Sequence, residues 1–442
     1  MKGTIAIVFI AILCLSVFSA YSPKVKAQQS SGDWPMFHAD PSHSGVGTGD
    51  PVFNPEVLWK FNAGGSVYSS PAVVNGVVYV GTENGNFYAL NATNGFQIWN
   101  YNTGNTPGIW SSPAVVNGMV YVGGGSIIYA FDASSGAVLW NYTNGGTQPI
   151  LSSPAVAAGI VYIGSSDTPQ GGYIYALNAS TGTQIWNYNV KAAASSPAVV
   201  NGVVYMGAYP SIYAFNAATG SILWNYSSVA PSDSSPAVVN GVVYVGSWGF
   251  DETVYAFDAN DGSILWNYTT SGDVDSSPAV ANGVVYVGSG GHILGSPNNG
   301  NIYALNSTNG EKLWNFTPAF NSSYGNGVSS SPAVVKGVVY VGSYNWNVYA
   351  LNASSGAQLW NYTTGGDIES SPAVVNGVVY IGSDDGYVYA LSGSITSSPS
   401  PAPTSTPTVP EFSSWTILLL TSIMVSASLL VYFRKCKAGN AG

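Results

Sequence analysis

Five side chains suited to binding chemistry occupy one position of a repeated sequence unit. Asp233, Asp275 and Glu369 each stand directly before a Ser-Ser-Pro triplet, and so do Tyr68 and Trp110. Carboxylates bind cations, and aromatic rings stack against apolar faces such as that of a sugar. If the repeats bring these positions together around one channel opening, they would form an asymmetric mouth that could hold a cation or a sugar. Ordinary variation in solvated loops is the alternative, and the sequence leaves it open.

The other reactive side chains form no catalytic constellation. His38, His43 and His292 are the histidines of the chain, and a metal site would need about three ligands to converge. No hydroxyl nucleophile has a visible histidine partner, and Cys14 and Cys436 lie in the terminal segments. Paired carboxylates for glycoside cleavage stay open, because their separation cannot be read from sequence. We therefore assign no catalytic residue, and the presence of a metal remains unknown.

The positions that carry this chemistry belong to a unit that recurs eight times. Each copy contains Ser-Ser-Pro-Ala-Val, and successive prolines are 43 residues apart on average. That spacing is the length of a four-stranded propeller blade. The prolines are Pro71, Pro113, Pro154, Pro197, Pro236, Pro278, Pro332 and Pro372. The repeat predicts an all-β, eight-bladed β-propeller of four-stranded antiparallel blades.

Within each unit the residue types predict four strands. Ser-Ser-Pro-Ala-Val-Val opens the first, with proline near its start, where a missing N–H is tolerated. Asn75-Gly76 predicts a two-residue hairpin turn. Val77 to Gly81, Tyr88 to Leu90 and Ile98 to Tyr101 follow as the second, third and fourth strands. The second and third are apolar on both faces, which favours sheets packed between neighbours.

A second motif in the unit makes a family resemblance specific. Ala89-x-Asn91-x-x-x-Gly95-x-x-x-Trp99 is similar to the tryptophan-docking motif of the quinoprotein alcohol dehydrogenase-like family, whose repeats are called PQQ-like. The resemblance implies that each tryptophan packs against the adjacent blade, while Asp or Asn steadies the turn. The structural docking residues expected on this basis are Trp59, Trp99, Trp140, Trp186, Trp224, Trp266, Trp314 and Trp360.

The order of these tryptophans predicts how the ring closes. Trp59 precedes the first Ser-Ser-Pro, and the last unit ends at Leu391-Ser392 without a tryptophan of its own. We expect the strand Leu58 to Phe61 to complete the final blade. Closure of this kind removes an exposed sheet edge.

The resemblance also raises the question of a cofactor. The family's enzymes hold pyrroloquinoline quinone (PQQ), a tricarboxylate, with a calcium ion, basic partners and a stacking tryptophan. Lys191 is the one lysine expected in a mouth-facing loop here, and no arginine lies between Gln28 and Phe433. Carboxylates at the mouth would repel a trianion. We expect neither PQQ nor calcium as a cofactor.

The N-terminal part of the chain predicts export. Residues 1–27 combine a basic start, an apolar core and a small-residue cleavage site, as a signal peptide does; a retained anchor is the alternative. Residues 28–51 form a lead-in, and residues 52–392 hold the eight repeats.

The C-terminal part predicts attachment to a membrane. Residues 393–410 form a Ser/Pro/Thr-rich linker. Residues 411–437 contain an uncharged run, Trp415 to Phe433, long enough to span a bilayer, and then a basic tail that favours the cytoplasmic side. Pro410-Glu411-Phe412 resembles the archaeal PEF-type sorting signal, which implies a sortase-like processing enzyme. A plain single-span anchor is the alternative.

Asn-x-Ser/Thr sequons recur in the repeats and suggest glycosylation of an exported domain. Some fall on the docking turn, where the side chain is needed inward. The better candidates lie on the expected outermost strand: Asn141, Asn225, Asn267 and Asn361.

Charge excludes one class of partner. The formal net charge is −10, and between the terminal segments only Lys60, Lys191, Lys312 and Lys336 are basic. Nucleic-acid binding needs clustered Lys and Arg, so we exclude it. We expect a cell-surface, membrane-tethered module that binds an envelope protein or glycan through its mouth without catalysis. A PQQ-dependent dehydrogenase-like quinoprotein and a structural scaffold of the surface layer are the alternatives.

Overall fold

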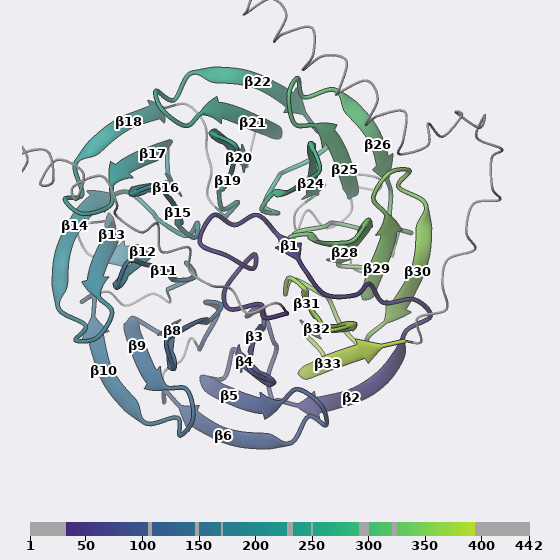
Figure 1. Ribbon diagram of the computed structural model, residues 1–442, viewed down its shortest axis with the longest axis horizontal. Coiled ribbons are helices and arrows are strands. Elements are labelled where there is room, and N and C mark those ends of the chain that lie inside the picture. The colour runs from purple at the N-terminus through teal and green to yellow at the C-terminus, as the bar shows by residue number, and fades with distance from the viewer. Residues whose placement is uncertain are drawn as a thin grey trace, which may run out of the picture. The chain divides into compact units, whose positions relative to one another are not determined.

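The predicted eight-bladed, all-β propeller is confirmed (Figure 1). The computed structural model describes residues 32–104, 108–145, 150–168, 171–227, 233–248, 251–290, 300–320 and 325–393. In these ranges no helix is long and apolar enough to cross a membrane. The predicted export signal, sorting motif and membrane span fall on residues 1–31 and 394–442, outside the described residues.

Blades 1 to 4 each consist of four consecutive antiparallel strands, which follow one another from the centre outward. Blade 1 contains β3 (Ala72–Val74), β4 (Val77–Gly81), β5 (Asn86–Asn91) and β6 (Gln97–Asn102). Blade 2 contains β7 (Ala114–Val116), β8 (Met119–Gly124), β9 (Ile127–Asp132) and β10 (Val138–Thr143). Blade 3 contains β11 (Ala155–Ala157), β12 (Ile160–Thr168), β13 (Gly171–Asn178) and β14 (Gln184–Val190). Blade 4 contains β15 (Ala198–Val200), β16 (Val203–Ala208), β17 (Ser211–Asn216) and β18 (Ile222–Ser227).

Blades 5 to 8 repeat this pattern, with one strand added to blade 7 and an N-terminal strand completing blade 8. Blade 5 contains β19 (Ala237–Val239), β20 (Val242–Gly246), β21 (Thr253–Asp258) and β22 (Ile264–Thr269). Blade 6 contains β23 (Ala279–Ala281), β24 (Val284–Ser289), β25 (Asn301–Asn306) and β26 (Lys312–Phe316). Blade 7 contains β27 (Ala333–Val335), β28 (Val338–Gly342), β29 (Asn347–Asn352) and β30 (Gln358–Thr363), with β1 (Val46–Gly47) parallel to β27. Blade 8 contains β31 (Ala373–Val375), β32 (Val378–Gly382), β33 (Tyr387–Ser392) and β2 (Glu56–Asn62).

The turn between the first two strands of a blade has the backbone that its sequence predicts. Asn75 and Gly76 have φ angles of 51° and 75°, and two successive positive φ angles define the hairpin turn that Asn-Gly favours. Because this turn sets the register, Val78 and Val80 of β4 are fully buried.

Neighbouring blades are joined by the tryptophan of each outermost strand. Its Nε1 donates a hydrogen bond of 2.7–3.0 Å to a backbone carbonyl of the next blade or, in one case, of Val52, which directly follows the lead-in. The donors and acceptors are Trp59 and Ala92, Trp99 and Ala133, Trp140 and Ala179, Trp186 and Ala217, Trp224 and Ala259, Trp266 and Ser307, Trp314 and Ala353, and Trp360 and Val52. A Cβ added to the motif glycine would collide with the ring: at Gly182 it would lie 2.6 Å from Trp140.

The ring closes through the N-terminal strand, as predicted. β2 pairs antiparallel with β33, so residues 56–62 form the outer edge of blade 8. At the join, Val52 takes the place of the turn residue that other blades supply. Trp360 Nε1 donates to the Val52 carbonyl at 2.7 Å, and the Val52 N–H donates to the Tyr340 hydroxyl at 2.7 Å.

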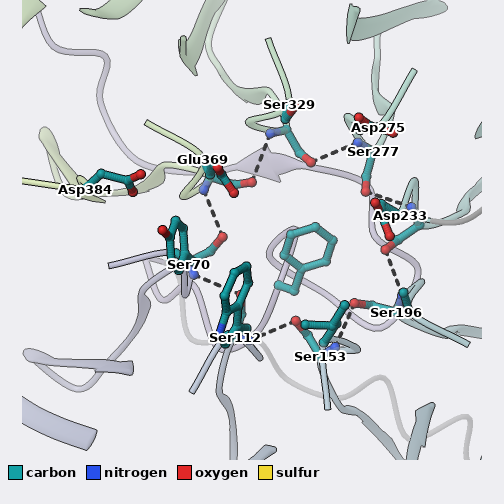
Figure 2. A pocket seen from close by; sticks show the side chains of 18 of the residues that line it. Ser70, Ser112, Ser153, Ser196, Asp233, Asp275, Ser277, Ser329, Glu369 and Asp384 are labelled. Atoms are coloured by element: carbon teal, nitrogen blue, oxygen red, sulfur yellow. Dashed lines mark hydrogen bonds between the residues drawn. The ribbon is translucent and has the colours of Figure 1, made fainter. Parts of the chain in front are cut away.

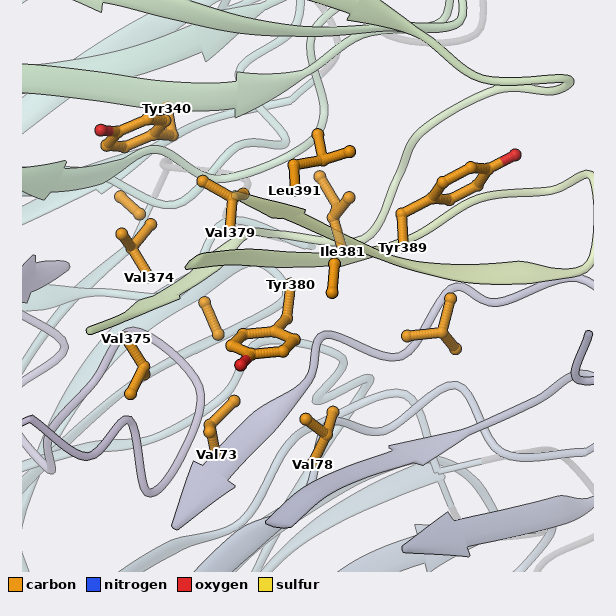
Figure 3. Packing of buried hydrophobic residues seen from close by; sticks show 14 of the residues in the cluster. Val73, Val78, Tyr340, Val374, Val375, Val379, Tyr380, Ile381, Tyr389 and Leu391 are labelled. Carbon is orange, nitrogen blue, oxygen red and sulfur yellow. The ribbon is translucent and has the colours of Figure 1, made fainter. Parts of the chain in front are cut away.

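The core consists of apolar layers between blades. At blade 8, Tyr380 extends from one face toward Val73 and Val78 of blade 1, and Val379 and Leu391 extend from the opposite face (Figure 3). Each of these side chains is at most 3% exposed. Burial of apolar side chains on both faces of a blade holds the closed ring together.

The lead-in crosses the centre of the ring (Figure 1). Its backbone carbonyls accept hydrogen bonds from the middle residues of six innermost strands. The acceptors are Trp34, Pro35, Pro41, Ser42, Ser44 and Gly45, and the donors are Val73, Val115, Val199, Val238, Val280 and Val334. These N–H groups would otherwise face the centre unpaired, so the lead-in both satisfies them and fills the axis.

Candidate functional site

All eight residues that precede Ser-Ser-Pro line one cavity of about 480 Å³ at one end of the ring, which we call the cup. They are Tyr68, Trp110, Leu151, Ala194, Asp233, Asp275, Ser329 and Glu369. The geometry therefore brings together every residue of the predicted mouth. Asp384 and Tyr344, from the loops after β32 and β28, line the same cavity.

A closed ring of serines forms the wall below the mouth (Figure 2). In each blade the hydroxyl oxygen of the second Ser of Ser-Ser-Pro accepts a hydrogen bond of 2.8–2.9 Å from the backbone N–H of the same serine one blade earlier. The members are Ser70, Ser112, Ser153, Ser196, Ser235, Ser277, Ser331 and Ser371, and the last bond runs from Ser371 N–H to Ser70. Since every serine is both donor and acceptor, the ring fixes the diameter of the cup.

In seven of the eight triplets the first Ser ties the innermost strand to the second strand, by accepting a hydrogen bond from a glycine N–H of that strand; among the described residues Ser69 does not make this bond. Ser234 Oγ, for example, accepts from the Gly246 N–H at 2.8 Å and donates to the Ser276 carbonyl of the next blade at 3.0 Å. Ser370 makes the equivalent contacts with Gly382 and Ser69. The repeated Ser-Ser pair thus has a structural function in the wall.

One arc of the cup is aromatic. The rings of Tyr68 and Trp110 are stacked, with centroids 4.3 Å apart and planes 20° from parallel. Burial, reinforced by the charge of Asp384, raises the pKa of the Tyr68 hydroxyl to about 12, so it stays protonated at neutral pH. Leu151 and Ala194 continue this arc without charge.

The opposite arc is acidic. Asp233, Asp275, Glu369 and Asp384 lie along one side of the serine ring (Figure 2). Asp233 is reached by solvent, yet the surrounding walls displace much of its water. This desolvation, with the like charge of Glu369, raises the pKa of its carboxyl. Asp233 and Glu369 therefore repel each other across the cavity.

Tyr344 lies within the acidic arc. It is 3% exposed, and its hydroxyl is 2.8 Å from the Ser329 hydroxyl. Burial and the charges of Glu369 and Asp275 raise the pKa of Tyr344 well above its usual value. It is therefore a neutral polar group beside the carboxylates.

Phe37 of the lead-in lines the cup from below and makes its floor. The Phe37 ring packs on His38 and His43, with centroid distances of 4.6 and 5.4 Å. Burial lowers the pKa of His38 to about 3 and that of His43 to about 4. The histidines are neutral at physiological pH, so they do not offset the negative charge above them.

None of the described lysines lines the cup. Lys336 pairs with Asp50 at 2.7 Å, and Lys60 and Lys191 lie over the rings of Tyr387 and Tyr209. A tricarboxylate such as PQQ would meet four carboxylates and no basic side chain among the described residues of the cup. The residues present therefore do not fit that cofactor. In the described ranges no three His, Cys, Asp or Glu side chains are grouped to hold a metal ion.

The structure also locates the sequons. On the outermost strands Asn141, Asn225, Asn267 and Asn361 are exposed. Asn361 differs from the others, because its amide donates to Asn347 Oδ1 at 2.8 Å. Asn315, at the equivalent place in blade 6, is exposed and bonded in the same way. On the docking turns the Asn side chain instead accepts backbone N–H groups, as at Asn178 Oδ1. Glycosylation of the outer-strand asparagines stays a prediction.

Several lining residues were not predicted from the sequence. Phe37 belongs to a lead-in whose path is set by contacts with distant strands. Asp384 and Tyr344 depart from the repeat consensus in the loops between second and third strands, a signal that could have identified them. The second serines were interpreted only as the start of a strand.

Comparison with known proteins identifies the repeat and the fold. A family model described as "Outer membrane protein assembly factor BamB" matches residues 52–211, 170–314 and 298–397, most of the chain. No curated protein matches the chain significantly.

Solved structures share the fold at low sequence identity. BamB from Moraxella catarrhalis has a TM-score of 0.62 at 20% identity, covering 76% of this chain and 97% of that chain. A europium-containing methanol dehydrogenase has a TM-score of 0.70 at 14% identity, covering 83% and 99%. Quinohemoprotein alcohol dehydrogenase from Comamonas testosteroni has a TM-score of 0.67 at 16% identity, covering 88% and 84%. At these identities the likeness concerns the fold alone.

Proposed function

We propose, from the premise that this chain belongs to the family described as outer membrane protein assembly factor BamB, that it is an envelope-associated module that binds a partner protein through the cup. The family description supports a protein partner, because it names a factor in the assembly of other proteins. The predicted export signal, linker and membrane span would hold the module at the cell surface.

The observation that carries this proposal is the construction of the cup. All eight blades contribute to its wall, the serine ring fixes its width, and the lead-in closes its floor. Its volume of about 480 Å³ lies within the range of ligand sites. A pocket that is already formed loses little entropy on binding, which favours recognition.

The quinoprotein dehydrogenase alternative has less support. Its cofactor does not fit the acidic cup, and a shared propeller fold does not transfer chemistry. A glycan partner would use the aromatic arc but would leave four carboxylates without a counter-charge. We therefore favour a protein that brings the opposite charge.

The test fills the cup without changing its charge. Ala194 lines the cup, and Ala218 is exposed on a turn at the opposite end. The full-length protein in detergent would be used to capture partners from envelope extract, as wild type, Ala194→Trp and Ala218→Trp. We expect Ala194→Trp to lose at least 90% (about tenfold) of a captured protein that Ala218→Trp retains.

Equal capture by both variants would show that the cup is not the binding face. Capture that disappears after enzymatic removal of glycans from the extract would instead identify a glycan partner and overturn the proposal.

A further inference from the structure

We propose that the cup holds a basic side chain, the guanidinium of Arg or the ammonium of Lys, which the partner protein inserts between the acidic and aromatic arcs. This inference rests on the proposed function and names the chemistry that the cup recognises.

Charge gives the first argument. Asp233, Asp275, Glu369 and Asp384 face one cavity, and the described lysines lie elsewhere. The raised pKa of Asp233 reflects loss of water first and repulsion by Glu369 second. A cation placed between these groups relieves that repulsion, whereas a neutral ligand leaves it in place.

The spread of the carboxylates selects the kind of cation. They come from blades 5, 6 and 8, and no three acidic or histidine side chains of the described ranges are grouped around one point. A bare metal ion would reach too few of them. A guanidinium offers five N–H donors in a planar fork, and an ammonium offers three, so either can contact separate acceptors.

The serine ring adds polar groups that point to a ligand independently of charge. Ser235, Ser277 and Ser331, of blades 5, 6 and 7, lie along the acidic arc, line the cup and are 2%, 2% and 4% exposed. Each hydroxyl oxygen accepts one backbone N–H, which leaves a second lone pair and the hydroxyl hydrogen without a partner in the described part of the chain. Nearly buried hydroxyls with unused capacity are expected to meet polar atoms of a ligand.

The aromatic arc suits the rest of such a side chain. Tyr68 and Trp110 stack on each other, and both line the cavity. The aliphatic stem of Arg or Lys packs on aromatic rings while its charged head reaches the carboxylates. Phe37 limits how deep the side chain enters.

The experiment uses three peptides that differ in one residue. Ac-Gly-Gly-Arg-Gly-Gly-NH₂, its Lys counterpart and its citrulline counterpart, the neutral analogue of Arg, are titrated into the full-length protein in detergent by calorimetry. We expect the Arg and Lys peptides to bind at least tenfold (about 1.4 kcal/mol) more tightly than the citrulline peptide. Binding should weaken as salt concentration rises.

Two double variants with the same charge change provide the control. Asp233→Asn/Glu369→Gln removes two carboxylates of the cup, and Glu56→Gln/Glu311→Gln removes two exposed carboxylates at the opposite end of the ring. The first should weaken binding of the Arg peptide by at least tenfold (about 1.4 kcal/mol). The second should leave it unchanged.

The outcomes separate this inference from the proposed function. If the citrulline peptide binds as tightly as the Arg peptide, or neither basic peptide binds, recognition of a basic side chain is wrong, even if Ala194→Trp still abolishes capture of a partner protein. If the Arg peptide binds through the acidic arc while Ala194→Trp leaves capture unchanged, the cup recognises cations but is not the partner-binding face.

Discussion

Acid should loosen the floor of the cup, because His38 and His43 are buried there in the neutral form. Burial, with their mutual repulsion, lowers the pKa of His38 from 6.5 to about 3. Burial outweighs the attraction of Asp40 and lowers the pKa of His43 to about 4. In the unfolded chain both return to about 6.5. The unfolded state therefore binds more protons than the native state between pH 6.5 and 4, and stability falls as the pH is lowered through this window.

The magnitude follows from these shifts. At pH 5, about 1.5 units below the unfolded pKa, protonation stabilises each unfolded histidine by about 2 kcal/mol, at about 1.36 kcal/mol per unit. The buried histidine stays almost unprotonated in the folded protein and gains almost nothing. The two histidines together should cost about 4 kcal/mol of unfolding free energy between pH 7.5 and pH 5. Carboxylates with lowered pKa, such as Asp132 at about 2, act in a more acidic window.

The assay is urea denaturation followed by tryptophan fluorescence at pH 7.5, 6 and 5, on wild type and on His38→Asn/His43→Asn. Both positions have positive φ angles, 54° and 57°, which Asn tolerates. The variant will be less stable at pH 7.5 because packing is lost, so the readout is the change of stability with pH. His292 is present in both proteins and cancels.

We expect the variant to lose less than half as much stability as wild type between pH 7.5 and 5. An unchanged pH dependence would refute the reasoning, since it would mean that the two histidines are not held neutral beneath the cup.

Three further predictions concern the ring and the wall. In denaturation, Gly182→Ala should destabilise the protein by about 1–3 kcal/mol more than Gly202→Ala. Both glycines have a positive φ, but only at Gly182 would the added Cβ collide with the Trp140 ring. Equal losses of stability would contradict tight packing of Trp140 on Gly182. Ser196→Ala should cost about 1–3 kcal/mol by leaving a buried N–H of the adjacent blade without an acceptor, and Ser196→Thr, which keeps the hydroxyl, should cost less. Asp233→Asn should raise the thermal midpoint at pH 7 slightly, because the gain in unfolding free energy is less than about 1 kcal/mol at a site that solvent screens. Because the pKa of this carboxyl is raised in the folded state, its contribution to stability is present below the unfolded pKa and is lost as the pH rises through the folded pKa. A lower midpoint of the variant at pH 7 would therefore count against like-charge repulsion.

Much of the fold could be predicted because it is local and repeated. Asn75-Gly76 specifies its hairpin through residues that are adjacent in the chain. The 43-residue period then places equivalent residues at equivalent positions in space. For that reason the residues before Ser-Ser-Pro could be assigned to one mouth, and Trp59 to the closing strand, without coordinates.

The rest of the cup depends on contacts between residues far apart in the chain. The serine ring closes through a bond between Ser371 and Ser70, 301 positions apart, and Val52 completes the docking of Trp360 across 308 positions. No local propensity encodes such pairs, because they form only when the eight blades have closed and left backbone groups to be satisfied.

The sequence by itself therefore determined the blades, their number, the order in which the ring closes and the residue types at its mouth, since these follow from a period and from turns of two residues. Only the tertiary structure decided that the lead-in fills the axis, that Phe37 is the floor and that Asp384 joins the other three carboxylates. The physical reason is that a non-repeating segment takes its path from the hydrogen bonds and apolar surface that the finished ring offers, and these do not exist before the ring is assembled.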